Sequence, residues 1–238
     1  MPEPVITILV ALWKAGRFLD AKLKNLEQQT LFDRCNIVLL NCQNLEGEAD
    51  IYADFLAEHD NATEIRYSQH MRLYPTWNDG IKATKSEFIM NSNVDDMLHP
   101  QYIEKCTEWL GKNPNFSVVS SKIITTDVPN QVWPNWGAII GIIPFKAYPK
   151  STAGPCPVWR RLLHSKYGYF GNYRTIGDAK MWEKWYAGSE QFGLIDEKLV
   201  LYLASSQSLE RRVDCTTMKS YRDLDIEETK KGDGPKNL

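Results

Sequence analysis

The chain has 238 residues, of which 43 % are hydrophobic and 24 % are charged, and its formal net charge is -2. This composition is that of a globular protein, because disordered chains have fewer apolar residues and a larger net charge. Proteins that neutralise nucleic-acid phosphates usually carry more Lys and Arg than Asp and Glu, whereas this chain has 28 Lys and Arg against 30 Asp and Glu. The composition therefore argues against general nucleic-acid binding.

Short apolar runs alternate with helical patterns through the first half of the chain. The continuous apolar runs at 5–12 and 36–40 are typical of strands that are buried on both faces. Strands separated by helices predict an α/β fold with a mainly parallel central sheet flanked by helices. Further strands are predicted at 64–67, 87–90 and 116–121, and helices are predicted around 19–26, 51–55, 76–83 and 100–113.

The second half has a different character. Residues 126–157 are rich in proline and aromatic side chains and show no periodicity, which is typical of a functional loop or lid. Helices are predicted near 157–167 and 178–187, and strands near 191–195 and 199–203. The last residues are polar and are predicted to fray. We expect a domain over 1–222, with halves at 1–125 and 126–222, followed by a polar tail at 223–238.

The cysteines and the N-terminus bear on the compartment. The five cysteines form no Cys-x-x-Cys pair, which fits free thiols in a reducing compartment. The apolar run Val5–Trp13 is too short to span a bilayer and follows no basic segment, so we expect neither a signal peptide nor a transmembrane segment. We therefore expect a cytoplasmic protein, and attachment to the inner face of a membrane stays open.

The acidic turn Asn93-Val94-Asp95-Asp96 follows the strand predicted at 87–90. Open α/β sheets bind ligands beyond the carboxyl ends of their strands. Two adjacent carboxylates repel each other there unless a cation lies between them, and such oxygen ligands suit Mg²⁺ or Mn²⁺. An isolated Asp pair is more often a helix cap or a solvated turn, so the pair alone does not decide.

The pair is not isolated, because the sequence resembles the family 2 glycosyltransferases over roughly residues 4–205. The matching segments, in order, are Ile6–Leu12, Ile37–Gln43, Asn78-Asp79-Gly80-Ile81, Asn93-Val94-Asp95-Asp96 and Gly177-Asp178-Ala179-Lys180-Met181-Trp182. The resemblance implies a single Rossmann-like glycosyltransferase domain of type A. Its first half would bind a nucleotide-sugar, and its aromatic-rich second half would bind the acceptor.

The resemblance also implies a reaction. A metal-dependent, inverting transferase would move a sugar from a nucleotide-diphosphate sugar, with a UDP-sugar favoured, to a hydroxyl of a glycan or another acceptor, as in polysaccharide biosynthesis. Asp95 would bind Mn²⁺ or Mg²⁺ with the donor diphosphate, and Asp178 would be the general base, although Asp178 could instead cap a helix. The other donor-binding candidates are Asn41, Gln43, Arg72, Asn78, Asn93 and Asp96.

The aromatic side chains of the second half are the candidates for acceptor binding. Their faces can stack on sugars, although rings of this kind also fill protein cores. The acceptor-binding candidates are Trp136, Trp159 and Tyr169, and the phosphate candidates are Arg160 and Arg161, either of which could be a surface charge.

Three departures from the family pattern leave other functions open. The second strand ends in Asn41-Cys42-Gln43-Asn44 instead of an Asp that holds the base, the acidic turn begins with Asn93, and the first strand lacks the usual P-x-(Y/F)-N ending. One alternative is a degenerate, non-catalytic carbohydrate-binding relative. Another is a nucleotidyltransferase of similar fold. Such an enzyme has a Gly-rich phosphate-binding loop, and Ala15-Gly16-Arg17 resembles that loop only weakly. A homodimer stays open as well.

Overall fold

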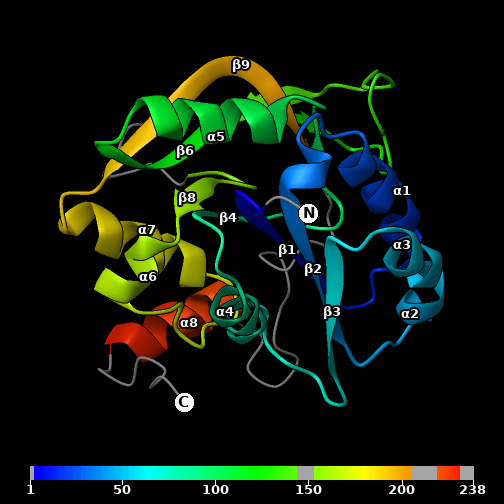
Figure 1. Ribbon diagram of the computed structural model, residues 1–238. Coiled ribbons are helices and arrows are strands. Elements are labelled where there is room, and N and C mark those ends of the chain that lie inside the picture. Colours follow the sequence, from blue (N-terminus) through cyan, green and yellow to red (C-terminus); the bar gives the residue numbers. More distant parts are fainter. Residues whose placement is uncertain (1–2, 144–152, 205–218, 231–238) are drawn as a thin grey trace.

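The computed structural model describes residues 3–143, 153–204 and 219–230, and the structural statements below refer to these ranges. At their centre lies a nine-stranded sheet with the order β3-β2-β1-β4-β8-β6-β9-β5, and β7 pairs with β6 beside this row (Figure 1). The strands are β1 (Ile6–Leu12), β2 (Cys35–Cys42), β3 (Ala62–Tyr67), β4 (Phe88–Asn91), β5 (Met97–Leu98), β6 (Phe116–Thr126), β7 (Gly141–Ile143), β8 (Val158–Arg160) and β9 (Gln191–Leu203). The helices are α1 (Gly16–Glu27), α2 (Glu48–Ile51), α3 (Ala53–Glu58), α4 (Leu73–Ala83), α5 (Tyr102–Lys112), α6 (Leu162–Tyr167), α7 (Gly177–Ala187) and α8 (Tyr221–Lys230), with a short 3₁₀ turn at Phe32–Arg34.

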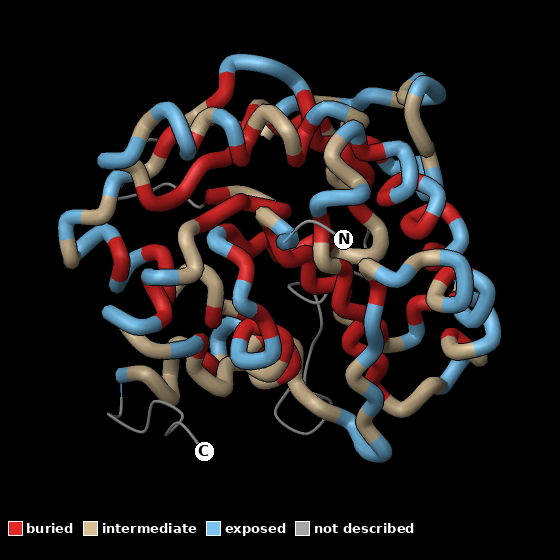
Figure 2. The backbone as a smooth tube through the Cα atoms, in the orientation of Figure 1, coloured by how far each residue is buried: buried red, intermediate tan, exposed pale blue. Residues whose placement is uncertain are grey.

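The first four strands of the row are parallel, and their composition explains why. β1 and β2 are rich in apolar residues and are buried along nearly their whole length (Figure 2). Strands covered by helices on both faces need such continuous apolar runs, whereas a strand with one wet face alternates. β1 lies between β2 and β4, so that Ile6 has Cys35 on one side and Phe88 on the other. The predicted α/β fold is confirmed.

The other half of the sheet is mixed. β8 lies between β4 and β6 and is antiparallel to both, and β5 is antiparallel to β9. β6 and β9 are parallel, with shifts of register between Ser121 and Ile123. Because β6 pairs with β8 and β9, the two halves predicted to meet at residues 125 and 126 interlock in one sheet.

Each face of the sheet has its own core, because successive side chains of a strand point to opposite sides. Val10 of β1 packs in a cluster with residues of α1, α3 and α5, whereas Leu9 packs in a cluster with residues of α4, α6 and α7. Figure 1 shows the same division of helices between the two faces. The second core is rich in aromatic residues: Tyr74, Trp77, Trp159, Phe170, Trp182 and Trp185. The four described cysteines are free and buried, as small core residues.

Two predicted elements have different boundaries in the structure. The helix predicted over 157–167 begins with β8, and only its second part is the helix α6. The strands predicted at 191–195 and 199–203 are one strand, because β9 resumes its pairing with β6 after the shift of register. None of the described helices is both long and apolar enough to cross a membrane.

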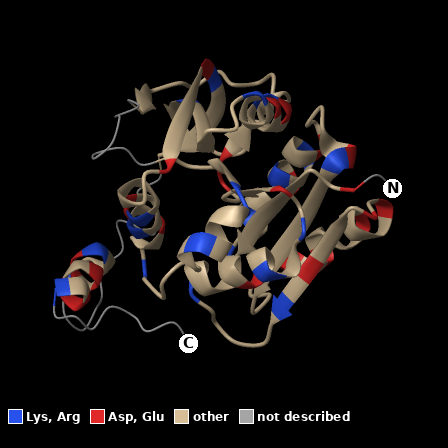
Figure 3. Ribbon diagram, turned by 60° about the vertical axis from the view of Figure 1, so that its left-hand side comes forward, with Lys and Arg blue, Asp and Glu red and all other residues tan. Residues whose placement is uncertain are grey.

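The polar stretch predicted to fray from residue 223 contains the helix α8, so that prediction is wrong for the part that the structure describes. Figure 3 shows charges of both signs on α8. Asp225 is the only completely buried residue of this helix. The polar composition predicts a frayed tail, whereas the Asp225 side chain is buried in the protein and helps to hold the helix in place.

Candidate active site

The carboxyl ends of the parallel strands meet at one edge of the sheet. Leu12 at the end of β1 lies beside Asn41 near the end of β2. Leu9 of β1 lies beside Asn91, the last residue of β4, so the turn that follows β4 starts at the same edge. Open α/β sheets bind their ligands at this edge.

The turn from Asn93 to Asp96 presents one carboxylate and buries the other. Asp95 is partly exposed, and the burial of the rest of its carboxyl raises its pKa. Asp96 is completely buried and accepts hydrogen bonds from Asn93 Nδ2 at 2.9 Å and from the backbone N–H of Leu203 at 3.1 Å. Burial, reinforced by the Asp95 charge, raises the pKa of Asp96 to about 8. Asp96 therefore holds the turn, and Asp95 is the carboxylate that a ligand can reach.

A buried lysine that sequence reasoning missed lies against this turn. Lys22 of α1 is completely buried, and its ammonium group donates to Ser92 Oγ at 2.9 Å and to the backbone carbonyl of Asp96. Burial lowers the pKa of Lys22, and the neighbouring acidic groups oppose this only in part. The lysine therefore ties α1 to the backbone of the acidic turn.

The helical spacing of α1 contained a signal for this contact. Lys22 and Asn25 lie on the same face as Leu19 and Leu26, where an amphipathic helix has apolar residues. Asn25 also faces inwards: its Nδ2 donates to the carbonyl of Leu98 at 2.7 Å, and its Oδ1 accepts the N–H of Leu98 at 2.8 Å. Two polar residues on an apolar face thus fasten the segment after β4.

Asp95 fits a divalent cation that is shared with a substrate. The described residues contain no group of three or more His, Cys, Asp or Glu side chains that could hold a metal on its own. Mg²⁺ is usually bound by one or two carboxylates together with substrate phosphates, and it keeps several waters. One accessible carboxylate is therefore sufficient when the substrate supplies the phosphates.

Asp178 lies in the first turn of α7, against Tyr74 of α4. The Tyr74 hydroxyl is 3.1 Å from Asp178 Oδ1 and 2.7 Å from the carbonyl oxygen of Thr175, and the N–H of Ala179 donates to Asp178 Oδ1 at 2.8 Å. Burial, with the charge of Asp178, raises the pKa of Tyr74 well above its usual range, so the hydroxyl keeps its proton and donates. The N-cap position belongs to Ile176, so Asp178 is not the cap.

The segment before α7 is also held by α4. The side-chain amide of Asn78 donates to the carbonyl of Phe170 at 2.8 Å and accepts its N–H at 3.0 Å. Arg72 donates to the carbonyl of Asn172 at 2.8 Å. Both ends of the Asn78 amide are bonded to Phe170, so Asn78 positions this segment, and its contact with the donor stays a prediction.

The turn after β2 offers Gln43 and not Asn41 to a ligand. Asn41 is completely buried, its Nδ2 donates to the Tyr52 hydroxyl at 2.8 Å, and its Oδ1 accepts the N–H of Asn44 at 3.1 Å. The amide of Asn41 therefore shapes the turn, and its contacts do not support the prediction that it touches the donor. Gln43 is partly exposed at a left-handed backbone position with φ 71°.

Residues 7–168 of the chain match the sequence model of glycosyl transferase family 2. The chain belongs to this family. EpsH of Bacillus subtilis (strain 168), a protein named as a candidate glycosyltransferase, is 28 % identical over 111 residues, which are 47 % of this chain and 32 % of EpsH. The family match ends before α7, so it does not include Asp178.

Solved structures with the same fold support the assignment of the architecture. Residues 1–349 of S. aureus TarS in complex with UDP-GlcNAc superpose with a TM-score of 0.68 and 14 % identity, over 83 % of this chain and 58 % of that one. The mannosyltransferase PcManGT of Pyrobaculum calidifontis in complex with GDP-Man and Mn²⁺ gives a TM-score of 0.68 and 12 % identity, over 87 % of this chain and 59 % of that one. The chain thus spans less than two thirds of each of these relatives.

Two of the predicted phosphate contacts in this family member lie at the opposite edge of the sheet. Arg160 of β8 lies beside Phe88, the first residue of β4, and donates to the backbone carbonyls of Leu110 and Phe116. Arg161 likewise donates to a backbone carbonyl, that of Ser86. These arginines fasten the amino edge of the sheet, so their described contacts do not support phosphate binding at the carboxyl edge.

Trp159 is a core residue and not an acceptor platform. Its ring is completely buried, and its indole N–H donates to Nε2 of His164 at 2.9 Å. Since Nε2 must then accept, Nδ1 of His164 carries the proton and donates to the carbonyl of Gly168 at 3.0 Å. Burial lowers the pKa of His164 to about 4, which keeps the ring neutral. The complete burial of Trp159 does not support the prediction that its ring stacks on a sugar.

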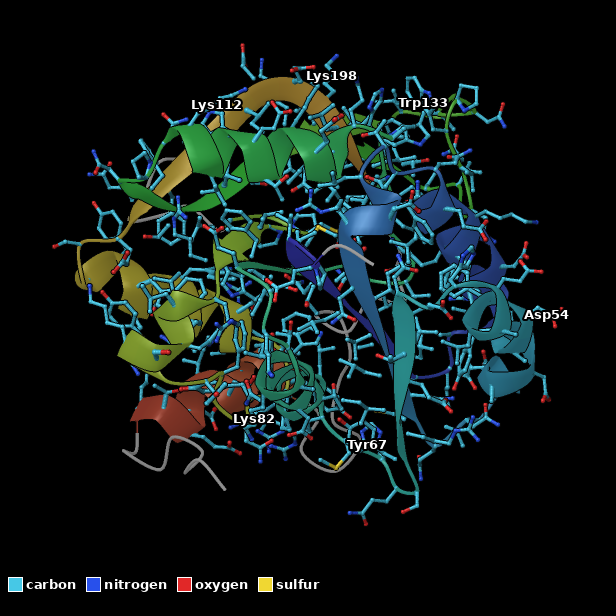
Figure 4. The ribbon with its side chains drawn as sticks, in the orientation of Figure 1. Asp54, Tyr67, Lys82, Lys112, Trp133 and Lys198 are labelled. Atoms are coloured by element: carbon cyan, nitrogen blue, oxygen red, sulfur yellow. The ribbon has the colours of Figure 1, made fainter. Side chains whose placement is uncertain are left out.

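The two other aromatic candidates lie in different places. Trp136 packs edge-on against Trp133. Gln28, the residue that follows α1, donates to the carbonyl of Trp133 at 3.0 Å, so this part of the predicted loop lies against the end of α1, where Figure 4 shows Trp133. Residues 144–152 of that loop lie outside the described residues. Tyr169 is exposed beside Lys82 in the last turn of α4, eight residues, or about 12 Å of helix, from Tyr74.

Proposed function

We propose that this protein transfers a sugar from a nucleotide-diphosphate sugar to an acceptor hydroxyl, with inversion at the sugar and with Asp178 as the general base. Membership of glycosyl transferase family 2 supports the reaction class. The observation that carries the proposal is the placement of two carboxylates, Asp95 and Asp178, on separate elements at the edge where the parallel strands end.

The chain connection of Asp95 and one contact of Asp178 support that placement. Asp95 follows the carboxyl end of β4. α4 starts after the carboxyl end of β3, and Tyr74 in its first turn contacts Asp178. In an inverting displacement the acceptor hydroxyl attacks opposite the leaving diphosphate while its proton passes to a base. The base and the carboxylate that holds the metal of the donor diphosphate must then be different groups, and in the proposal they are Asp178 and Asp95.

The donor is proposed to be bound through the acidic turn and Gln43. Mg²⁺ or Mn²⁺ held by Asp95 would neutralise the charge of the donor diphosphate, which the Asp95 carboxylate would otherwise repel. The similar folds were solved with UDP-GlcNAc in TarS and with GDP-Man and Mn²⁺ in PcManGT, which supports a nucleotide-diphosphate sugar as the donor class. We take a UDP-sugar as the expected donor and a GDP-sugar as the comparison.

The start of α1 argues against a nucleotidyltransferase. Such an enzyme would bind phosphate on backbone N–H groups of the loop that contains Gly16. Here the N–H of Gly16 donates to Glu46 at 3.0 Å, and the N–H of Ala15 donates to the buried Glu48 at 3.0 Å. Two carboxylates occupy the donors that a phosphate would need.

Calorimetric titration tests the proposal. UDP- and GDP-sugars are titrated into the protein with and without Mn²⁺, and sugar release or transfer is then followed with the donor that binds. We expect binding of one nucleotide-sugar that is strengthened by Mn²⁺, and turnover that is lost in Asp178→Asn. Binding without any turnover on a panel of glycan acceptors would favour a non-catalytic carbohydrate-binding relative.

A further inference from the structure

We infer that Asp225 of α8 is a positioning residue for the proposed general base, because it holds the backbone that leads into Asp178. The inference rests on the proposed function and extends it to a helix outside the family match. Asp225 lies 47 positions after Asp178 in the sequence, and no motif connects the two. Only the fold brings α8 to the start of α7 (Figure 1).

The carboxylate of Asp225 gathers the donors of three consecutive residues. It accepts the backbone N–H groups of Arg174 at 3.0 Å, Thr175 at 2.8 Å and Ile176 at 3.3 Å. It also accepts the Thr175 hydroxyl at 3.3 Å and the Arg174 guanidinium at 3.2 Å. The side chain of Asp225 is completely buried while it makes these bonds. A concave row of backbone N–H groups has thus closed around one anion.

The position of this carboxylate on α8 shows what the helix does. Asp225 is the only completely buried residue of α8, so the helix docks through an acid and not through an apolar face. Burying a carboxylate is costly unless it is well bonded, and bonds to an ionised acceptor are roughly twice as strong as neutral ones. Glu228 adds an ion pair to Arg174 at 2.7 Å. α8 is therefore attached at the one segment that precedes the proposed base.

The same segment is held from its other side by α4. Tyr74 donates to the carbonyl of Thr175 at 2.7 Å, so the N–H and the C=O of Thr175 are bound by α8 and α4 respectively. Gly177 packs directly on the Tyr74 ring, since a methyl group there would lie 2.6 Å from the ring. With Thr175 fixed and Gly177 in contact, Asp178 has little freedom to leave its place beside Tyr74. Asp225 thus acts on the reaction through the backbone.

The variant Asp225→Asn tests the inference. It keeps the size of the side chain but turns one of the two acceptor oxygens into an NH₂ donor that faces N–H donors. We expect kcat to fall by about 10- to 100-fold, because small displacements of a reacting group carry such a penalty, while the donor KM stays within about twofold. Amide hydrogen exchange at Arg174, Thr175 and Ile176 is expected to become faster. Glu227→Gln on the same helix, where Glu227 pairs with Lys219, is the control and keeps wild-type values.

The outcomes separate the inference from the proposed function. Rates are taken per folded molecule and compared with Asp178→Asn in parallel. If Asp178→Asn loses turnover while folded Asp225→Asn keeps the wild-type kcat, the inference is wrong and the proposed function stands. If Asp178→Asn keeps its turnover, the base itself is wrong. If Asp225→Asn does not fold, Arg174→Gln, which removes both guanidinium bonds to α8, replaces it: a lower kcat at an unchanged donor KM supports the inference, and an unchanged kcat overturns it.

Discussion

The hydroxyl of Tyr74 lies within hydrogen-bond distance of both Asp178 Oδ1, at 3.1 Å, and the carbonyl oxygen of Thr175, at 2.7 Å. One hydroxyl proton is thus shared between the proposed base and the backbone that precedes it. The arrangement links α4, which starts after the carboxyl end of the parallel strand β3, to the first turn of α7. A side chain and a backbone segment that lie about 100 residues apart in the chain thereby form one unit.

Asp178→Asn separates chemistry from structure. The amide oxygen can still accept from Tyr74 and from the N–H of Ala179, so we expect a loss of stability below about 1 kcal/mol, the value of a charge at a helix start. Turnover is expected to fall by about 10²- to 10⁴-fold, the usual contribution of a positioned base. Glu183→Gln, a change on the same helix where Glu183 pairs with Lys180, should leave both unchanged. Equal rates for Asp178→Asn and wild type would remove Asp178 from the mechanism.

Tyr74→Phe removes the shared hydroxyl and keeps the buried ring. The carbonyl of Thr175 then loses a donor, and we expect the free energy of unfolding to fall by about 1 kcal/mol, the usual net value of a hydrogen bond. Turnover should fall while donor affinity is retained, because the acidic turn is not touched. Denaturant unfolding and steady-state kinetics measure the two effects. A change in donor affinity alone would contradict this account of Tyr74.

The buried parallel strands β1, β2 and β4 and the acidic turn could be placed from the sequence because their signals are local, whereas the short strands β5, β7 and β8 could not. A buried parallel strand is a continuous apolar run, and a turn at its carboxyl end follows directly in the chain. The roles of Asn41 and Asn78 could not be read in this way, since their amides bond to residues that only the fold brings near. The burial of Trp159 could not be predicted either, because composition does not distinguish a ring in the core from a ring at the surface.

The burial of Asp225 could not be predicted from the sequence either. Its helix is polar throughout, and a polar, charged stretch normally remains in solvent. The local sequence does not show which acidic residue of such a stretch will be buried. The N–H donors that compensate for the burial of Asp225 belong to the distant residues Arg174, Thr175 and Ile176. The burial of Lys22, by contrast, could have been predicted from the sequence, since Lys22 occupies the apolar face of an amphipathic helix.

Donor binding is predicted to depend on a divalent cation at Asp95. Two charges about 4 Å apart interact by about 4 kcal/mol at an effective dielectric constant of about 20, so a diphosphate beside the Asp95 carboxylate is repelled without a metal. EDTA and Asp95→Ala should each weaken nucleotide-sugar binding, as measured by calorimetry. Asp54→Ala, on the outer surface of α3, is the control (Figure 4). Unchanged affinity after EDTA treatment would refute the prediction.

Lys22→Met tests the buried ammonium group under the turn. The change leaves the Asp96 carbonyl without its donor and the buried Asp96 without a nearby cation, and breaking such a buried arrangement costs about 3 kcal/mol. For a chain of this size we expect the melting temperature to fall by about 6–12 °C. Lys24→Met, on the exposed side of the same helix where Lys24 pairs with Asp20, should leave it unchanged. Equal melting temperatures for the two variants would show that Lys22 is not needed for the turn.

His164 predicts a loss of stability in mild acid. Its pKa is lowered from 6.5 to about 4 in the folded protein, chiefly by burial, so protonation favours the unfolded chain. The full contribution is present above pH 6.5 and is lost as the pH falls towards 4, with a total of about 3 kcal/mol. His164→Gln does not titrate, so its stability relative to wild type should improve over that interval. A difference between the two proteins that is constant from pH 7 to pH 4 would contradict the lowered pKa.

The three residues of β8 have a consequence for how the chain can be divided. β4 and β6 do not pair with each other, and β8 joins them through Trp159 and Val158, each of which has a partner on both sides. A fragment that ends before β8 would also lack β9, so that β4 would have an open edge and β6 would keep only β7, and such edges pair with other molecules. The protein should therefore unfold in a single calorimetric transition, and a fragment that ends before β8 should aggregate when it is produced alone.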